Sequence, residues 1–193
     1  VVQMVREQSR AKIFLDLKLH DISATVGRAM ERVAGLGVEL VTVHTSSSFQ
    51  MLENAVRAGK GKTGVLGVTL LTDNDAAAVE AGGFRDEFVR DTGKLVMLRA
   101  HAAHRAGCAG VVCSGKEAAR IKARFGSSFM AVTPGIRPQW SLLEHDDQKR
   151  VTTPARAIAQ GSDLLVIGRP IRDAKDPAGA ARKVAQEIRD ALA

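Results

Sequence analysis

Tyrosine is absent from this 193-residue sequence, tryptophan occurs once, and aromatic residues make up only 4% of the chain. Because nucleic-acid strands are commonly bound by stacking bases on aromatic side chains, the composition argues against such a surface. The two cysteines, Cys108 and Cys113, are too few for a disulfide framework, and their spacing matches no zinc motif. Cys113 lies in an apolar run, where a buried thiol is expected.

Long apolar runs are also missing from the sequence. No stretch reaches the ~18–20 residues of a membrane-spanning helix. The first residues show no signal-peptide pattern. Together with the scarcity of cysteine, these features predict a protein of the reducing cytoplasm that has no membrane partner.

The net charge of +7 allows two interpretations. Clustered lysines and arginines would indicate nucleic-acid binding. The basic residues are instead spread along segments with helical patterns, as at Arg28, Arg32 and 182–183. We therefore expect a solvated basic surface and no nucleic-acid partner, with a mild positive field that helps to attract a small anionic substrate.

Short apolar runs rich in β-forming residues alternate with segments of helical pattern. The predicted strands are 13–19, 38–44, 64–71, 110–114, 130–136 and 164–171. The predicted helices are 22–36, 49–59, 86–106, 115–126, 154–161 and 177–192. This alternation is typical of parallel strands joined by crossover helices.

Six β/α units fit either an open doubly wound sheet or a barrel that lacks two units. A Rossmann glycine fingerprint is absent. Residues 1–5 have the pattern of a helix already under way, with no strand before it. We infer from the usual size of such barrels that about 40 residues, two β/α units, precede Val1 in the intact protein.

One predicted strand, within 12–22, carries charges. Because side chains alternate along a strand, Asp16 and Lys18 share one face, and the leucines between and after them share the other. Charges inside a barrel are costly unless they are paired, so this interpretation makes Asp16 and Lys18 partners. The alternative is an edge strand with a solvated polar face. For Asp21, capping of the following helix is an equally good interpretation.

The segment 16–22 (DLKLHDI) resembles the Asp-x-Lys-x-x-Asp-Ile signature of the orotidine 5′-phosphate decarboxylase family. Further segments resemble that family in the same order along most of the chain. They are 41–44 (VTVH), 68–72 (VTLLT), 110–114 (GVVCS), 132–138 (VTPGIRP), 147–150 (DQKR), 166–171 (VIGRPI) and 176–177 (DP).

The resemblance implies an α/β fold, a (β/α)8 TIM barrel. Six β/α units lie in this chain, the first two are absent, and a single N-terminally incomplete domain covers 1–193. It implies decarboxylation of orotidine 5′-phosphate to uridine 5′-phosphate in de novo pyrimidine biosynthesis, without a cofactor or a metal. Lys18 is expected to donate the proton and Asp16 to hold Lys18. Asp21 and Thr25 are expected to reach the partner's site in a homodimer.

The resemblance also implies how a phosphorylated nucleotide substrate is bound. Thr72 is expected to contact the pyrimidine. Arg137 is expected to close a lid, and Gln148 on that lid to touch the phosphate. Gly168 and Arg169 are expected to bind the phosphate through a backbone amide and a guanidinium.

Two other functions stay open at this point. A related magnesium-dependent decarboxylase of 3-keto sugar-acid phosphates uses the same charged strand, although segments 134–137 and 147–150 argue against it. A truncated, non-catalytic barrel that binds phosphate ligands is the other. The sequence also departs from the family pattern at 23–24, where serine and alanine replace proline and asparagine, and at 47–48, where two serines replace glycines.

Overall fold

The computed structural model describes residues 1–141 and 151–192. The chain divides into two compact units. Unit 1 comprises Val1–Thr69 and Leu98–Val111, and unit 2 comprises Leu70–Met97 and Val112–Ala193. Each unit is built from parallel strands and the helices that connect them. The single domain expected over 1–193 stays a prediction.

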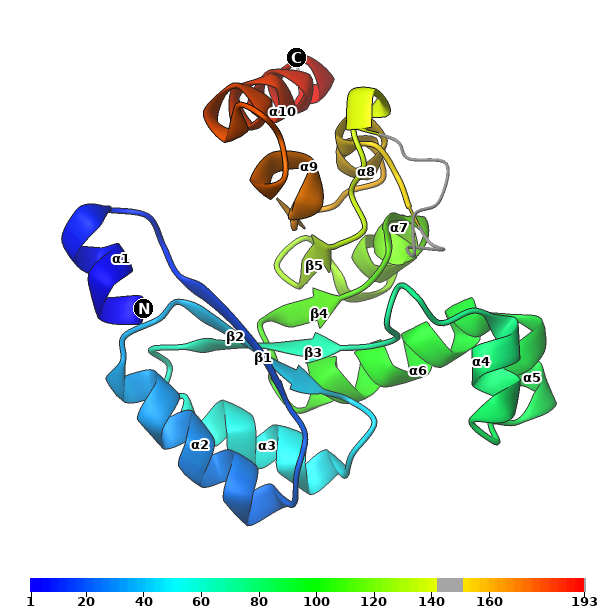
Figure 1. The fold of residues 1–193 in the computed structure, drawn as a ribbon. Helices are drawn as coiled ribbons and strands as arrows, with labels where there is room; N and C mark the ends of the chain where they lie inside the picture. The colour runs from blue at the N-terminus through cyan, green and yellow to red at the C-terminus, as the bar shows by residue number, and fades with distance from the viewer. Residues whose placement is uncertain (142–150, 193) are drawn as a thin grey trace. The chain divides into compact units, whose positions relative to one another are not determined.

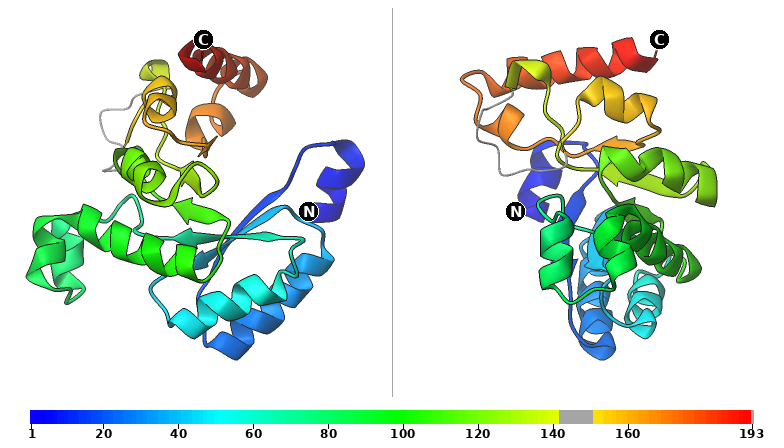
Figure 2. Two further views of the ribbon diagram at one scale, coloured as in Figure 1. Left: turned by 180° about the vertical axis from the view of Figure 1, so that it is seen from behind. Right: turned by 90° about the vertical axis from the view of Figure 1, so that its right-hand side faces the viewer.

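Unit 1 holds the charged strand. Its elements are α1 (Val2–Gln8), β1 (Phe14–Leu19), α2 (Ser23–Gly35), β2 (Leu40–His44), α3 (Phe49–Ala58) and β3 (Gly64–Val68). Two further elements, α6 (Thr92–Arg105) and β4 (Gly110–Val112), begin in one unit and end in the other. Helices α2 and α3 lie side by side on one face of β1, β2 and β3 (Figures 1 and 2).

Unit 2 contains the segments that are expected from the sequence to bind phosphate. Its elements are α4 (Ala76–Ala81), α5 (Asp86–Arg90), α7 (Gly115–Phe125), β5 (Met130–Thr133), the 3-10 helix η1 (Gln139–Ser141), α8 (Pro154–Ala159), β6 (Leu164–Leu165), α9 (Arg169–Arg172) and α10 (Pro177–Leu192). None of the helices in the described ranges is both long and apolar enough to span a membrane.

The strands are neighbours in the order in which they occur along the chain, from β1 to β6. The pairs β1–β2, β2–β3 and β5–β6 are parallel. This order, with a helix after most strands, is that of successive β/α units in a barrel and not that of a doubly wound sheet, whose order reverses. The predicted α/β barrel type, with six units in this chain, is confirmed.

The core follows from the apolar periodicity of the sequence. On α2, Val26, Met30 and Val33 are buried at the spacing of one helix face. The strands add fully buried valines such as Val41 and Val43. Both cysteines are buried, as expected for Cys113, and neither forms a disulfide. Burial raises the pKa of Cys108 to about 12.

Several predicted boundaries differ from the structure. The helix predicted at 86–106 is broken at Asp91, which is extended and accepts a hydrogen bond from the Gly93 amide. The strand predicted at 130–136 ends at Thr133, before a proline that lacks an amide hydrogen. The strand predicted at 164–171 covers only Leu164–Leu165, and Pro170 lies in the first turn of α9 instead.

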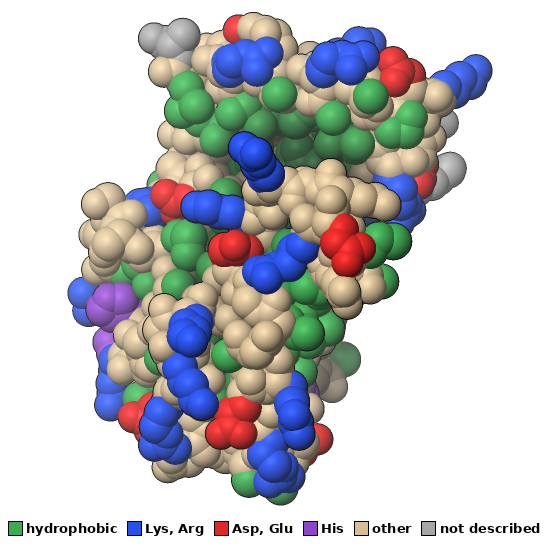
Figure 3. Space-filling view, turned by 90° about the vertical axis from the view of Figure 1, so that its left-hand side faces the viewer, with side chains coloured by type: hydrophobic (Ala, Val, Ile, Leu, Met, Phe, Trp, Pro, Cys, Tyr) green, Lys and Arg blue, Asp and Glu red, His purple; other side chains and the backbone are tan. Residues whose placement is uncertain are grey.

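Basic side chains are dispersed over the face drawn in Figure 3. Lysines and arginines lie there among aspartates and glutamates, and they do not form one continuous patch. Several basic side chains of the described residues form ion pairs, such as the exposed pair between Arg172 and Asp173. This distribution agrees with the solvated basic surface expected from the sequence.

Candidate active site

Strand β1 carries a close ion pair. The Lys18 Nζ lies 2.5 Å from Asp16 Oδ2, and the two side chains are 40% and 44% exposed, respectively. Exposed ion pairs stabilise a fold by about 0–1 kcal/mol, because water screens them and two long side chains must be held still. The predicted pairing of these residues is confirmed, but β1 is the end strand of the described sheet and the pair is partly exposed, as in the alternative of an edge strand. Their contribution to folding is too small to explain the pair.

The backbone of β1 is strained at the lysine. Lys18 has a φ of 49°, in the left-handed region that costs a non-glycine residue about 1–2 kcal/mol. The register to β2 changes at the same place, from Leu15 opposite Val41 to Leu19 opposite Val43. The simple alternation expected from the sequence is therefore interrupted, and Leu17 is 48% exposed instead of packed under a helix.

A buried hydroxyl connects the two charged residues. Thr42, in the middle of β2, is fully buried. Its Oγ1 accepts a hydrogen bond from the Lys18 amide (2.8 Å) and donates one to Asp16 Oδ1 (2.7 Å). Sequence reasoning did not select Thr42 as a site residue. The available signal was a polar residue between two buried valines.

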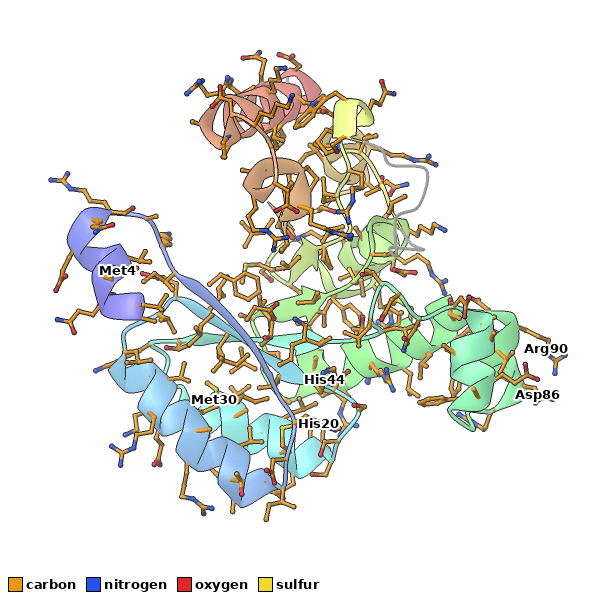
Figure 4. All side chains as sticks on the ribbon, viewed as in Figure 1. Met4, His20, Met30, His44, Asp86 and Arg90 are labelled. Atoms are coloured by element: carbon orange, nitrogen blue, oxygen red, sulfur yellow. The ribbon has the colours of Figure 1, made fainter. Side chains whose placement is uncertain are left out.

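Two histidines lie at the ends of β1 and β2. The rings of His20 and His44 are tilted against each other with centroids 5.2 Å apart (Figure 4). Burial lowers the pKa of His44, and the positive charges of His20, Lys18 and Arg99 lower it further. The strand ends of unit 1 therefore combine several positive or protonatable groups with the carboxylate of Asp16.

Asp21 lies just beyond β1 and is exposed. Its carboxylate accepts a hydrogen bond from the neighbouring Ile22 amide (2.6 Å). Ile22 is the N-cap of α2, and no side chain caps that helix. The structure thus decides against the capping interpretation. Thr25, one turn into α2, interacts with Arg28 through a long 3.5 Å hydrogen bond.

Unit 2 contains a cavity of about 240 Å³ with two arginines in its wall. Arg137, which follows β5, is buried, and its guanidinium donates to the carbonyl of Ile136. Arg169 is the first residue of α9 and lines the same cavity. Asp173 also lines it, and the hydrogen bond from Arg172 lowers the pKa of that carboxyl. Paired guanidinium groups are suited to binding phosphate.

Gly168 precedes Arg169 at the start of α9. A Cβ at this position would meet no other atom of the described chain within 4 Å, and its φ of −97° is negative. Neither a close neighbour nor a left-handed backbone therefore requires glycine here. The open space above its backbone is what a phosphate oxygen needs in order to approach an amide.

A family model with the description "Orotidine 5'-phosphate decarboxylase / HUMPS family" matches residues 1–184. The chain is 50% identical over 182 residues to orotidine 5'-phosphate decarboxylase of Desulfosudis oleivorans, covering 94% of this chain and 73% of the relative. It is 47% identical over 178 residues to the enzyme of the same name from Rhodopseudomonas palustris, covering 92% of this chain and 72% of the relative.

The chain belongs to the orotidine 5'-phosphate decarboxylase / HUMPS family. The relatives identify it as an enzyme of the carboxy-lyase class. The fold agrees, because the crystal structure of orotidine 5'-phosphate decarboxylase from Lactobacillus acidophilus matches with a TM-score of 0.74 and 32% identity. That match covers 97% of this chain and 79% of the other.

The residues implied by the family resemblance fall into both units. Unit 1 brings Asp16 and Lys18 together, and unit 2 places Arg137 and Arg169 in one cavity. Thr72 is buried in unit 2. Gln148 lies outside the described residues. Within the described ranges, no three histidine, cysteine, aspartate or glutamate side chains form a group suited to a metal ion.

Proposed function

We propose that this chain decarboxylates orotidine 5′-phosphate to uridine 5′-phosphate, a step of de novo pyrimidine biosynthesis, in the cytoplasm. The observation that carries the proposal is the 2.5 Å contact between Lys18 and Asp16 on a strained strand. Backbone strain of this kind concentrates at functional sites, where it aims a side chain. The family membership supplies the reaction class in which an ammonium at this position has a use.

Lys18 acts as the proton donor in the proposed reaction. The bond from the ring carbon to the carboxylate breaks, and its electron pair stays on that carbon as carbon dioxide leaves. The ammonium of Lys18 stabilises the developing negative charge and then transfers a proton to the carbon. Lys18 is left as a neutral amine and regains a proton from solvent, so the reaction needs no cofactor.

Asp16 holds the ammonium and, in the proposed complex, lies beside the substrate carboxylate. Two like charges in contact disfavour the bound substrate and are relieved when carbon dioxide departs. Asp16 also orients the ammonium, because its Oδ2 accepts a hydrogen bond from Lys18 Nζ.

Two arginines of unit 2 bind the phosphate of the substrate in this proposal. Arg137 and Arg169 supply guanidinium donors, and Gly168 supplies a backbone amide. Thr72 contacts the pyrimidine, and Gln148 touches the phosphate. Binding energy from a group far from the reacting bond orients the substrate and promotes closure over it.

The proposed enzyme is a homodimer. Asp21 is exposed, and its carboxylate accepts a hydrogen bond from the Ile22 amide instead of capping α2. This carboxylate is therefore accessible to a second subunit. Thr25 lies four residues further along the chain, in the first turn of α2. Both residues complete the site of the partner subunit.

Loss of ultraviolet absorbance from orotidine 5′-phosphate tests the proposed function. The purified chain should turn over this substrate in the presence of a chelator, because the reaction needs no metal. Lys18→Ala should lose nearly all turnover, whereas Lys12→Ala, an exposed lysine just before β1, should keep it. Turnover that depends on added magnesium, or no turnover with ligand binding retained, would contradict the proposal.

A further inference from the structure

Thr42 differs from Thr45 and Thr63, two other buried threonines of unit 1, in what its hydroxyl contacts. Thr45 and Thr63 donate to backbone carbonyls, those of Val68 (2.7 Å) and Val38 (2.8 Å). Such bonds satisfy a buried hydroxyl and tie neighbouring segments together. The Thr42 hydroxyl is bonded instead to both members of the charged pair, Asp16 and Lys18.

The register of the sheet places Thr42 for this contact. Leu15 lies opposite Val41, so the next residues along each strand, Asp16 and Thr42, lie beside each other. Valine or isoleucine at position 42 would fill the same buried space but offer no hydrogen-bonding group. A polar residue in this apolar strand therefore has a specific contact to explain it.

The first of the two bonds stabilises the unusual backbone of β1. Lys18 is left-handed, and its amide donates to the threonine side chain instead of to a strand carbonyl. A partly buried amide without an acceptor is costly, so the hydroxyl makes this conformation tolerable. The left-handed conformation also directs the Lys18 side chain back toward the carboxylate of Asp16.

The second bond sets the orientation of the carboxylate. Thr42 donates to Asp16 Oδ1, and Lys18 donates to Asp16 Oδ2. With one donor on each oxygen, the plane of the carboxylate is determined, and so is the direction from which the ammonium approaches. A hydroxyl that both accepts and donates is required for this, which only threonine or serine supplies at this size.

We propose that Thr42 is a positioning residue, whose buried hydroxyl holds Lys18 in its left-handed conformation and aims the Asp16–Lys18 pair for proton transfer. It touches neither the substrate nor the reacting atoms. The inference rests on the proposed function for its catalytic consequence. Its structural half concerns the Lys18 amide and stands independently.

Kinetic comparison of Thr42→Val and Thr42→Ser tests the catalytic half. Valine keeps the shape of threonine and removes the hydroxyl, so we expect kcat to fall by about 10- to 100-fold, as for loss of hydrogen bonds to a charged group. KM should change by less than about threefold, because no contact with substrate is lost. Serine should restore kcat, and Thr63→Val, a buried control bonded to Val38, should leave it unchanged.

Amide hydrogen exchange of Lys18, followed by NMR, tests the structural half without any turnover. We expect Thr42→Val to accelerate exchange of the Lys18 amide by about tenfold or more, as for loss of one hydrogen bond. Thr42→Ser and Thr63→Val should leave it at the wild-type rate. Thermal unfolding of each variant separates this local effect from general destabilisation.

The kinetic comparison and the amide-exchange experiment test the proposed function and the role of Thr42 separately. If the wild-type chain turns over no substrate, the proposed function is wrong, and the exchange data alone decide whether Thr42 holds Lys18. An unchanged Lys18 amide in Thr42→Val overturns the positioning role. So does normal kcat in Thr42→Val, or a Thr42→Ser enzyme as slow as the valine variant.

Discussion

At the scale of single residues, the sites are built from groups whose surroundings matter more than their type. The lysines at positions 12 and 18 are six residues apart, yet among the described residues only Lys18 of the two forms a close ion pair and has a strained backbone. Arg137 is buried while Arg172 is exposed and paired. These differences, and not composition, indicate which side chains carry the chemistry.

His44 makes the stability of the fold sensitive to acid. Because burial and nearby positive groups lower its pKa below the ordinary 6.5, the unfolded chain takes up a proton at higher pH than the folded chain does. The His44 contribution is complete above about pH 6.5 and is lost as the pH falls below that value. We expect the melting temperature to drop between about pH 7 and pH 5, and His44→Asn to reduce that drop.

An NMR titration of the histidine rings tests the cause. Removing the neighbouring ring in His20→Asn should raise the pKa of His44, because one of the positive groups that lower it is gone. A His44 pKa that stays the same in this variant, or a melting temperature equally acid-sensitive in His44→Asn, would refute the account.

Arg169 is expected to contribute to binding and little to folding. Arg169→Ala removes a charge-assisted hydrogen bond to phosphate, so affinity for uridine 5′-phosphate should fall by about 10- to 100-fold. Isothermal titration calorimetry measures this directly. The matched control is Arg189→Ala, on the exposed side of α10, where the guanidinium contacts only Gln186 among the described residues. Equal affinities in the two variants would remove Arg169 from the phosphate site.

At the scale of elements, a glycine in α7 packs closely against the segment that precedes α8, next to the proposed phosphate site. A Cβ at Gly115 would lie 2.6 Å from the methyl group of Thr152. Thr152 in turn forms backbone hydrogen bonds with Gly135 and Arg137. The segment that carries Arg137 is therefore positioned by close packing against the first turn of α7.

Gly115→Ala should destabilise the protein although alanine favours helices. We expect a loss of about 1–3 kcal/mol, as for overpacked sites, and weaker binding of uridine 5′-phosphate because the Arg137 backbone shifts. Gly35→Ala is the control, since Gly35 is in α2 with no atom within 4 Å of an added Cβ. That variant should be neutral or stabilised by up to about 1 kcal/mol. Unchanged binding and stability in Gly115→Ala would contradict this packing argument.

Most elements were predictable from the sequence. Along most of the chain, the spacing of apolar residues and the residues that typically begin or end helices and strands indicate the same elements. Helix α2 is one example, with Val26, Met30 and Val33 on a single face. The break at Asp91 was missed, although the polar run 90–94 (RDTGK) interrupts the apolar pattern there. The extent of β6 was overestimated because the apolar run 164–171 continues from a strand into the first turn of α9.

The site was predictable only in part. The Asp16–Lys18 pair follows from strand alternation and the cost of unpaired charge. The left-handed backbone at Lys18 does not, because a register change depends on the partner strand and leaves no trace in local composition. Thr42 was missed for the same reason, since its contacts depend on which residue β1 places beside it.

At the scale of the whole molecule, the proposed dimer makes a prediction about mixed subunits. Asp16→Ala and Asp21→Ala should each inactivate the homodimer. In a mixed dimer, one site receives Asp16 from its own subunit and Asp21 from the partner. Random mixing should therefore restore about a quarter of wild-type turnover, because half of the dimers are mixed and each has one intact site.

Mixing Asp16→Ala with Lys18→Ala is the control for that experiment. Both residues act within one subunit, on the same strand, so no exchange of subunits rebuilds an intact site. Recovery in this control, or none in the first mixture despite exchange of subunits, would show that Asp21 does not act across an interface.

Decarboxylation of orotidine 5′-phosphate in heavy water tests the central claim, that Lys18 replaces the lost carboxylate with a proton drawn ultimately from solvent. Mass spectrometry of the product measures both turnover and deuterium. The account predicts uridine 5′-phosphate carrying one deuterium on the ring carbon that lost carbon dioxide, and almost no product from Lys18→Ala. Product formed by Lys18→Ala at the wild-type rate, or none formed by the wild-type chain, would contradict it.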